Sequence, residues 1–520
     1  MSVETPTRFD EAQQPARGRP LDRHRTPAPQ RLRGAAVVLG AVACAALVAV
    51  WPTLTLAVLG LVIVITLAFG APPFGVAAAV LLYGFEGVMK VGLAREIPAL
   101  GVAPEAVGAA IIDLALFAAV LGILRQDRGR TVRAIWSNAG RWTRIGLALL
   151  AGWLVLSVLQ MFLTSDLGTA VAGLRLTQAY VLALLAGAML LAARPPERVL
   201  AALVAVLLVI AAYAAFRAVV GPSADERVAA FSRSTTPLVP VENGVIFRNI
   251  GSFSSAIGLT SFLVPAAVFL FALGLSPAVR LRLAAWVGVA LVVLALVATY
   301  VRMSLIATAL GVVCAAALFA TASDLARRTK MALALVSVPA VIVLLMLGTL
   351  AETTLSGNSA QVQQRSAGVL NPLSDPSVKA RLQRWRDALG VVQANPLGTG
   401  VGTVGSATVD EEEGTATFAD NSYLKILLEQ GPLGGLAFSF GVLLTLIGTA
   451  LGVVRRSIAR RAPGIAALSA SASFFVLGLA SEAIEQPGKV LGWLLLGVAL
   501  WAAFGSAPGG GRRSPAQGVA

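Results

Sequence analysis

Long apolar runs alternate with short polar connections along most of this chain. The runs are continuous and have the roughly 17–25 residues that a helix needs to cross a bilayer, whereas β-barrel strands would alternate apolar and polar residues. The pattern predicts an all-α bundle of about twelve to fourteen transmembrane helices. The run 424–454 is long for one span and contains Gly431-Pro432, which favours a short helix followed by a separate crossing. The predicted spans are 35–52, 54–70, 74–91, 105–124, 145–163, 174–193, 199–220, 251–275, 283–300, 303–320, 331–350, 424–454, 464–482 and 490–505.

The composition also points to a membrane protein. Of the 520 residues, 57% are hydrophobic and 13% are charged, and the mean hydropathy is +0.81. Soluble globular domains have about a quarter of their residues charged. An ordinary soluble protein is therefore excluded, and the predicted fold class is a polytopic integral membrane helical bundle.

The positive charge lies mainly on one side of the predicted membrane. A formal net charge of +15 would by itself suggest a nucleic-acid partner. However, Lys and Arg concentrate in alternate connections such as 125–144 and 455–461, as the positive-inside rule requires. This distribution predicts cytoplasmic termini, an outer location for 221–250 and 351–423, and membrane lipids instead of nucleic acid as partners.

The same pattern divides the chain into five segments. Residues 1–33 and 506–520 are polar and are typical of disordered cytoplasmic tails. Between them lie a transmembrane bundle of about eleven helices over 34–350, an outer loop over 351–423, and the last transmembrane helices over 424–505.

Cysteine and histidine are too scarce for several kinds of site. Cys44 and Cys314 both fall inside predicted spans, which excludes a disulfide framework and a thiolate metal cluster of usual spacing. His24, the only histidine, lies in the N-terminal tail. We therefore expect no metal and no cofactor, and a proton acceptor at an outer site must be a carboxylate, a tyrosine or the substrate.

The outer loop is unusually long for a connection between bilayer helices, which makes it the best candidate for the site of chemistry. Asp375-Pro376 predicts a helix start and Asn395-Pro396 its end. The expected apolar stripe of this helix is Val378, Leu382, Trp385, Leu389 and Val392. A flexible turn follows, formed by Gly398, Gly400, Gly402 and Gly405. We expect an amphipathic helix that lies on the outer leaflet.

Five arginines on the predicted outer side are candidates for binding a diphosphate. They are Arg248, Arg302, Arg381, Arg384 and Arg386. A guanidinium forms two parallel, charge-assisted hydrogen bonds with a phosphate, and several of them can neutralise a diphosphate. The same residues could instead hold an interfacial helix to anionic lipid or extend their charge out of the membrane at the end of a span.

The block Asp420-Asn421-Ser422-Tyr423-Leu424 is followed by Glu429-Gln430-Gly431. Four other segments carry recognisable motifs: Arg248–Phe253, Thr299–Ser304, Arg384–Leu389 and Asn395–Gly402. Together these motifs resemble the O-antigen ligase and O-antigen polymerase superfamily, and the resemblance covers about half of the chain. The most specific is the Asp420 block, which is similar to the family's His-Asn-x-Tyr-Leu block followed by Glu-x-Gly.

The resemblance implies roles for the residues of the most specific block. Asp420 stands where many members have the histidine that assists deprotonation of the acceptor hydroxyl, so the role of general base passes to its carboxylate. Asn421 and Tyr423 would orient sugar hydroxyls or a phosphate oxygen. Two alternatives remain open: Asp420 could cap a helix that begins at Asn421, and Asn421 and Tyr423 could satisfy local backbone groups.

The resemblance also implies the activity. The family comprises membrane glycosyltransferases of GT-C type that take glycan from a polyprenyl-diphosphate-linked saccharide. We therefore expect a metal-independent, inverting transfer to a glycan or lipid acceptor at the outer face of the cytoplasmic membrane, with the arginines stabilising the leaving diphosphate. The rival hypotheses are a transporter or flippase of lipid-linked saccharides and a non-catalytic scaffold.

Other charged residues have plainer interpretations. Glu429 lies nine residues after Asp420, hence on a different helix face, and is expected to pair with an arginine or to line the bundle interior. Glu86 and Lys90, four residues apart within a span, predict a buried structural pair. The acidic run Asp410–Glu413 predicts a solvated loop face.

Overall fold

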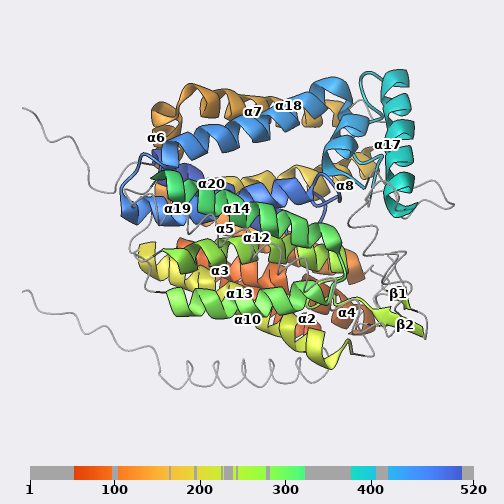
Figure 1. The fold of residues 1–520 in the computed structure, drawn as a ribbon, viewed down its shortest axis with the longest axis horizontal. Coiled ribbons are helices and arrows are strands. Elements are labelled where there is room, and N and C mark those ends of the chain that lie inside the picture. Colours follow the sequence, from red (N-terminus) through yellow and green to blue (C-terminus); the bar gives the residue numbers. More distant parts are fainter. Residues whose placement is uncertain are drawn as a thin grey trace, which may run out of the picture.

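In the computed structural model the chain forms a bundle of helices, most of which run side by side (Figure 1). The structure describes residues 52–96, 104–162, 166–192, 196–223, 227, 238–241, 244–276, 281–322, 376–405 and 420–505. Its helices are α2 (Pro52–Gly70), α3 (Pro72–Gly84), α4 (Glu86–Glu96), α5 (Pro104–Asp127), α6 (Arg130–Asn138), α7 (Arg141–Met161), α8 (Leu167–Thr177), η2 (Ala179–Val181), α9 (Leu182–Leu190), α10 (Pro196–Val220), α12 (Ala256–Leu275), α13 (Arg282–Val297), α14 (Arg302–Ala322), α17 (Pro376–Ala394), α18 (Ser422–Val453), α19 (Ile458–Leu477) and α20 (Lys489–Phe504).

The all-α membrane fold is confirmed. The described part of the chain contains eight helices that are long and apolar enough to cross a membrane, or nine if the bent pair Pro72–Gly84 and Glu86–Leu93 is one span. The shorter apolar helices α13 and α20 add to these. Every predicted span within the described residues overlaps a helix or a group of consecutive helices.

A small β-hairpin is the one addition to the helices among the described residues. Strand β1 (Leu238–Val241) pairs antiparallel with β2 (Gly244–Phe247), in a register that places Leu238 opposite Phe247. The hairpin was not expected from the sequence. It lies at the same end of the bundle as α17 (Figure 1).

The bundle has an enclosed centre and an apolar outside. All of α20 is buried, as are most residues of α12, and helices that are apolar all round belong in such positions. By contrast, α2 keeps large side chains such as Leu56 and Ile63 exposed. An exposed apolar face along a helix that is long enough to span a bilayer suits contact with lipid tails.

Helix α18 is broken near its beginning. Gly431 has non-helical angles (φ 66°, ψ −176°), so Ser422–Gln430 and the segment from Pro432 onward are two helices joined at a kink. A Cβ atom at Gly431 would lie 2.3 Å from the carbonyl oxygen of Pro396, so this close approach requires glycine. The expectation of a short helix before the crossing is confirmed.

Helix α17 runs across the end of the bundle instead of along it (Figure 1). Its buried residues Ala388 and Val392, with Trp385, pack against Leu424 and Leu428 of α18. The predicted stripe is wrong at Leu389, which is 47% exposed. Positions 385, 388 and 392 share one helix face, and that face packs on protein, whereas we had expected the apolar side of the helix to rest on lipid.

Several predictions lie outside the described residues. They concern the tail 1–33 with His24, the span 35–52 with Cys44, the span 331–350, Asp375, the acidic run Asp410–Glu413, and the tail 506–520. The division of the chain into five segments stays a prediction.

Candidate functional site

Asp420 lies two residues before the start of α18, at the end of the bundle that α17 crosses. Its backbone is in the left-handed region with φ +49°, a conformation that Asp adopts more readily than most residues. The backbone N–H of Asp420 donates to Glu482 Oε1 at 3.3 Å. The side chain remains 31% exposed, so the carboxylate is held by the protein and is still accessible.

Two of the five candidate arginines lie next to the Asp420 carboxylate. Arg384 Nη1 forms a hydrogen-bonded ion pair with Asp420 Oδ2, and Arg381 Nε lies 3.9 Å from the same oxygen. The two arginines are three residues apart on α17, so both point from one face of the helix. Arg386 is two residues further on and is exposed. The structure thus joins one carboxylate and two guanidinium groups from segments 36 residues apart in sequence.

Arg248 and Arg302 lie on neighbouring segments. The N–H of Asn249 donates to the carbonyl oxygen of Ala298 at 3.0 Å, and Phe247 and Val301 pack in one small apolar cluster. Both arginines are partly buried. The convergence of all five arginines on one diphosphate stays a prediction.

Asn421 is the cap of α18. Its Oδ1 accepts from the N–H groups of Tyr423 at 2.8 Å and Leu424 at 3.1 Å, and its Nδ2 donates to the carbonyl oxygen of Leu479 at 2.8 Å. The alternative in which Asp420 caps a helix that begins at Asn421 is therefore wrong. These contacts favour the local structural role for Asn421 over the substrate-orienting one.

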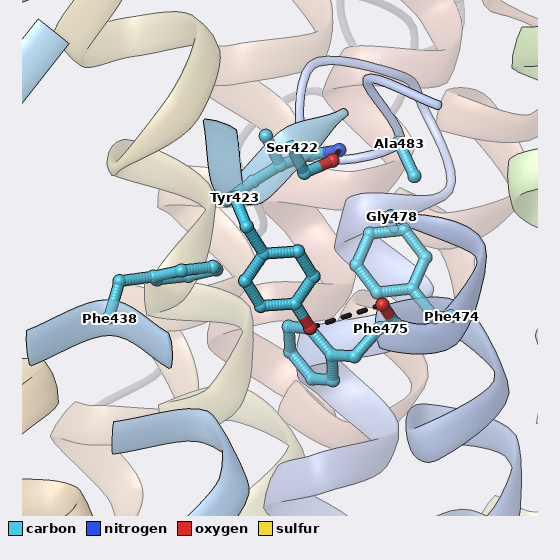
Figure 2. Close-up of a pocket in the computed structure, with 8 residues that line it drawn as sticks. Ser422, Tyr423, Phe438, Phe474, Phe475, Gly478 and Ala483 are labelled. Atoms are coloured by element: carbon cyan, nitrogen blue, oxygen red, sulfur yellow. Dashed lines mark hydrogen bonds between the residues drawn. The ribbon is translucent and has the colours of Figure 1, made fainter. Parts of the chain in front are cut away.

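Tyr423 points into the protein. Its hydroxyl donates to the carbonyl oxygen of Phe475 at 3.1 Å, and its ring lies 5.5 Å from that of Phe438. The ring helps to line a cavity of about 10 Å³ among the aromatic side chains (Figure 2). Such a volume is about that needed by one water molecule, so the contacts of Tyr423 also favour the local role.

The profile of a family described as O-antigen ligase matches residues 287–439, whereas curated proteins give no match. The match covers this part of the chain and supports its resemblance to the O-antigen ligase and polymerase superfamily. The matched range includes Arg302, Arg381, Arg384 and Asp420.

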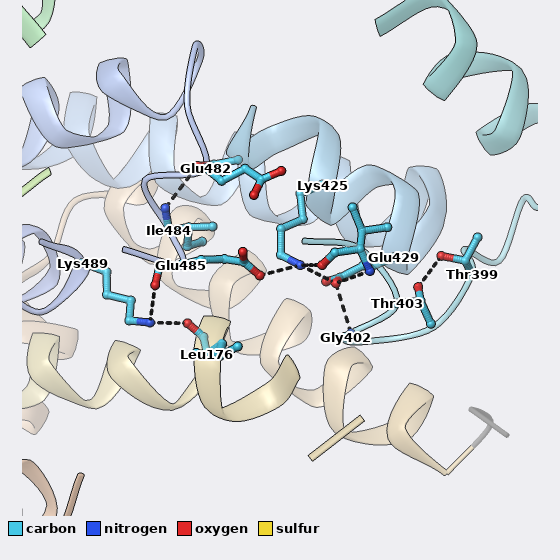
Figure 3. A network of polar contacts seen from close by, with 12 residues as sticks. Leu176, Thr399, Gly402, Thr403, Lys425, Glu429, Glu482, Ile484, Glu485 and Lys489 are labelled. Atoms are coloured by element: carbon cyan, nitrogen blue, oxygen red, sulfur yellow. Dashed lines mark hydrogen bonds and ion pairs between the residues drawn. The ribbon is translucent and has the colours of Figure 1, made fainter. Parts of the chain in front are cut away.

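Sequence reasoning missed a buried ionic network around Lys425 (Figure 3). Lys425 pairs with Glu429 and Glu485, and all three side chains are 0% exposed. Lys489 donates to the carbonyl oxygens of Leu176 and Glu485. The expectation that Glu429 pairs with an arginine is wrong, because its partner is Lys425, but its location inside the bundle is confirmed.

A sequence signal for this network did exist. Lys425 and Glu429 are four residues apart within a predicted span, and Glu485 and Lys489 are four residues apart just before the next one. Charges within membrane segments are rare unless they are paired or functional. The pairing of Lys425 with Glu485 could not be read from spacing, because the two residues are on different elements.

Other charged side chains also form pairs within the bundle. Asp113 of α5 forms an ion pair with Arg175 of α8 and accepts a hydrogen bond of 2.5 Å from the hydroxyl of Tyr180. The predicted pair between Glu86 and Lys90 is confirmed. These pairs neutralise charge where lipid and protein offer little solvation.

Proposed function

We propose that this protein is a membrane glycosyltransferase that takes glycan from a polyprenyl-diphosphate-linked donor and joins it to an acceptor hydroxyl at the outer face of the cytoplasmic membrane. Glycan transfer of the ligase or polymerase type is the general activity that the ligase domain indicates. The observation that carries the finer proposal is the accessible carboxylate of Asp420, held beside Arg381 and Arg384.

Asp420 is the proposed general base. The acceptor oxygen attacks the anomeric carbon, the bond from that carbon to the diphosphate oxygen breaks, and the diphosphate leaves with the electron pair. The hydroxyl proton passes to the Asp420 carboxylate. Attack from the side opposite the leaving group inverts the anomeric carbon. General bases of this kind contribute about 10²–10⁴ to a rate.

The arginines of α17 are proposed to hold the diphosphate. A guanidinium carries five N–H donors, and Arg384 uses one nitrogen on Asp420 while its side chain is 51% exposed. It can therefore hold the base and still donate to a phosphate oxygen. Arg248 and Arg302 are proposed to make a second contact with the donor. Arg386 is also proposed to contact the diphosphate, because it lies on α17 with Arg381 and Arg384.

The arrangement of charge supports an outer location. Helix α18 runs from Asp420 to the basic cluster of Arg455, Arg456, Arg460 and Arg461. Helix α6, which follows another basic segment, lies at that same end of the bundle, opposite α17 (Figure 1). Lys and Arg favour the cytoplasmic side, so Asp420 and α17 would face outward and both termini the cytoplasm.

The transporter hypothesis has less support. A polar route would need charged or polar residues from one end of the bundle to the other. The ionic network occupies the first turns of α18 and α20. From Leu433 to the end of α18, and from Val490 to the end of α20 at Phe504, neither helix has another charged residue. These two helices therefore provide no charged route across the bundle.

The test is transfer by the purified full-length protein in liposomes that contain a polyprenyl-diphosphate-linked oligosaccharide and a candidate glycan or lipid acceptor. We expect the parent protein to release polyprenyl diphosphate and to form the glycosidic product. Asp420→Asn should lower both about 10²–10⁴-fold, whereas the matched change Asp387→Asn, in an exposed carboxylate on α17, should leave both unchanged. Translocation of the donor without product would establish the flippase instead.

A further inference from the structure

We propose that Lys425 is a positioning residue, which holds the loop before α20 against the glycine turn and thereby places Asp420 beside the arginines of α17. This proposal rests on the proposed function for its consequence. Its structural part depends only on contacts among described residues. Lys425 itself is fully enclosed and cannot touch a substrate.

Lys425 joins three separate segments of the chain. Its ammonium pairs with Glu429 on its own helix, lies 2.8 Å from Glu485 Oε1 in the loop between α19 and α20, and donates to the carbonyl oxygen of Val404 in the glycine turn (Figure 3). Burying a lysine without partners is costly. The buried ammonium therefore favours a fold in which all three segments contact it.

Glu429 and Glu485 extend the junction to the glycine turn. Glu429 Oε1 accepts from the N–H of Gly402 at 3.1 Å. A Cβ atom at Gly405 (φ +87°) would lie 2.6 Å from Glu485 Oε2, so the absence of a side chain lets the carboxylate sit against the turn. The two carboxylates therefore share one ammonium, and removal of that ammonium leaves like charges facing each other inside the protein.

The loop that Lys425 holds also carries the contacts of Asp420. Glu482 accepts from the N–H of Asp420. The N–H of Ser422 donates to the carbonyl oxygen of Ser481 at 3.1 Å, and the N–H of Ile484 donates to Ser422 Oγ at 3.2 Å. Displacement of Glu485 would therefore move the residues that hold Asp420.

Helix α17 rests on the glycine turn as well as on α18. The apolar cluster around Ala388 and Val392 also contains Val404, whose carbonyl oxygen accepts from Lys425. Loss of Lys425 should thus loosen both the loop before α20 and the glycine turn, and change the position of Asp420 relative to the arginines of α17. Small misplacements of reacting groups cost about 10²-fold in rate, so the larger effect should fall on kcat and the smaller one on the KM for the donor.

The test compares Lys425→Met, Glu485→Gln and their double variant in the liposome assay, normalised to folded protein. We expect kcat to fall about 10–100-fold in each single variant. The double variant should be no worse than Lys425→Met, because both substitutions break the same ion pair between Lys425 and Glu485. Glu485→Gln is the milder change, because Lys425 keeps Glu429 and Val404, so the proposal remains testable if Lys425→Met does not fold. Lys90→Met, in a pair of the same spacing with Glu86, is the matched control and should leave kcat unchanged.

A second readout does not need transfer activity. Spin labels at positions 389 on α17 and 479 in the loop, both exposed, with Cys44 and Cys314 replaced by serine, report the distance between the two segments. We expect Lys425→Met and Glu485→Gln to shift or broaden that distance distribution, and Lys90→Met to leave it unchanged. Unchanged distances, unchanged kcat, or an effect confined to KM would overturn the proposal. If the parent transfers no glycan, the proposed function fails while the distances still decide whether Lys425 positions the loop.

Discussion

Two groups of ion pairs lie close together at one end of this protein, and they differ in exposure to solvent. Around Asp420, the side chains of Arg381 and Arg384 are 33% and 51% exposed. Around Lys425, the side chains of Glu429 and Glu485 are wholly buried. An exposed pair contributes little to stability and can exchange partners, whereas a buried pair is costly to break. The first arrangement suits a site that binds and reacts, and the second suits its support.

The largest expected effect is on transfer, and it tests the exposed group around Asp420. Asp420→Asn removes the proposed base without changing the size of the side chain. We expect transfer to fall about 10²–10⁴-fold, with thermal stability close to that of the parent because the lost pair is partly exposed. Product formation and thermal unfolding of the same preparation measure the two effects. A variant that keeps full transfer would remove Asp420 from the chemistry.

The next prediction compares how much each group of ion pairs contributes to the free energy of unfolding. Lys425→Met leaves two buried carboxylates without their cation and should destabilise the fold by about 3–5 kcal/mol. Arg384→Ala breaks an exposed pair and should cost under about 1 kcal/mol. Denaturant unfolding in detergent micelles measures both. Equal losses would show that burial does not separate the two groups.

Substitution of Arg384 sharpens the comparison within the exposed group. Arg384→Lys keeps the charge and loses the planar fork, so we expect a rise in the KM for the donor of about tenfold, with a larger rise for Arg384→Ala. Arg386→Ala is the comparison on the same helix and should raise that KM less, since Arg386 does not share the face of Arg381 and Arg384. A larger loss for Arg386→Ala than for Arg384→Ala would place the diphosphate on the other face of α17.

The smallest expected effect concerns the cap between the two groups. Asn421→Ala removes the side chain that accepts from the N–H groups of Tyr423 and Leu424. We expect a loss of about 1 kcal/mol in the free energy of unfolding. The KM for the donor should stay unchanged if Asn421 serves only the backbone, and a rise in that KM would restore its substrate-orienting role.

Much of the fold followed from local pattern. Continuous apolar runs predicted the spans, Gly431-Pro432 predicted the break in α18, and Pro376 and Asn395-Pro396 predicted the ends of α17. Each of these features depends on residues within a few positions of one another. The predicted stripe of α17 was wrong at Leu389, which is exposed. Apolar spacing alone does not show which side of a helix a neighbouring element covers.

The site was only partly predictable. Motifs selected Asp420 and the arginines of α17, and the structure places Arg381 and Arg384 on that carboxylate. Spacing along the chain could not predict this contact, because it joins elements far apart in sequence.

The sequence by itself determined the class of protein and its helices, because bilayer length, apolar content and the positions of Gly and Pro act locally. It also supplied the residue types that a glycan transferase needs. Only the tertiary structure decided which charges meet: Arg384 with Asp420 in partial contact with solvent, and Lys425 with Glu429 and Glu485 inside the protein. The physical reason is that the strength of an ion pair depends on its burial and on its partner's position, and both arise only when distant segments pack together.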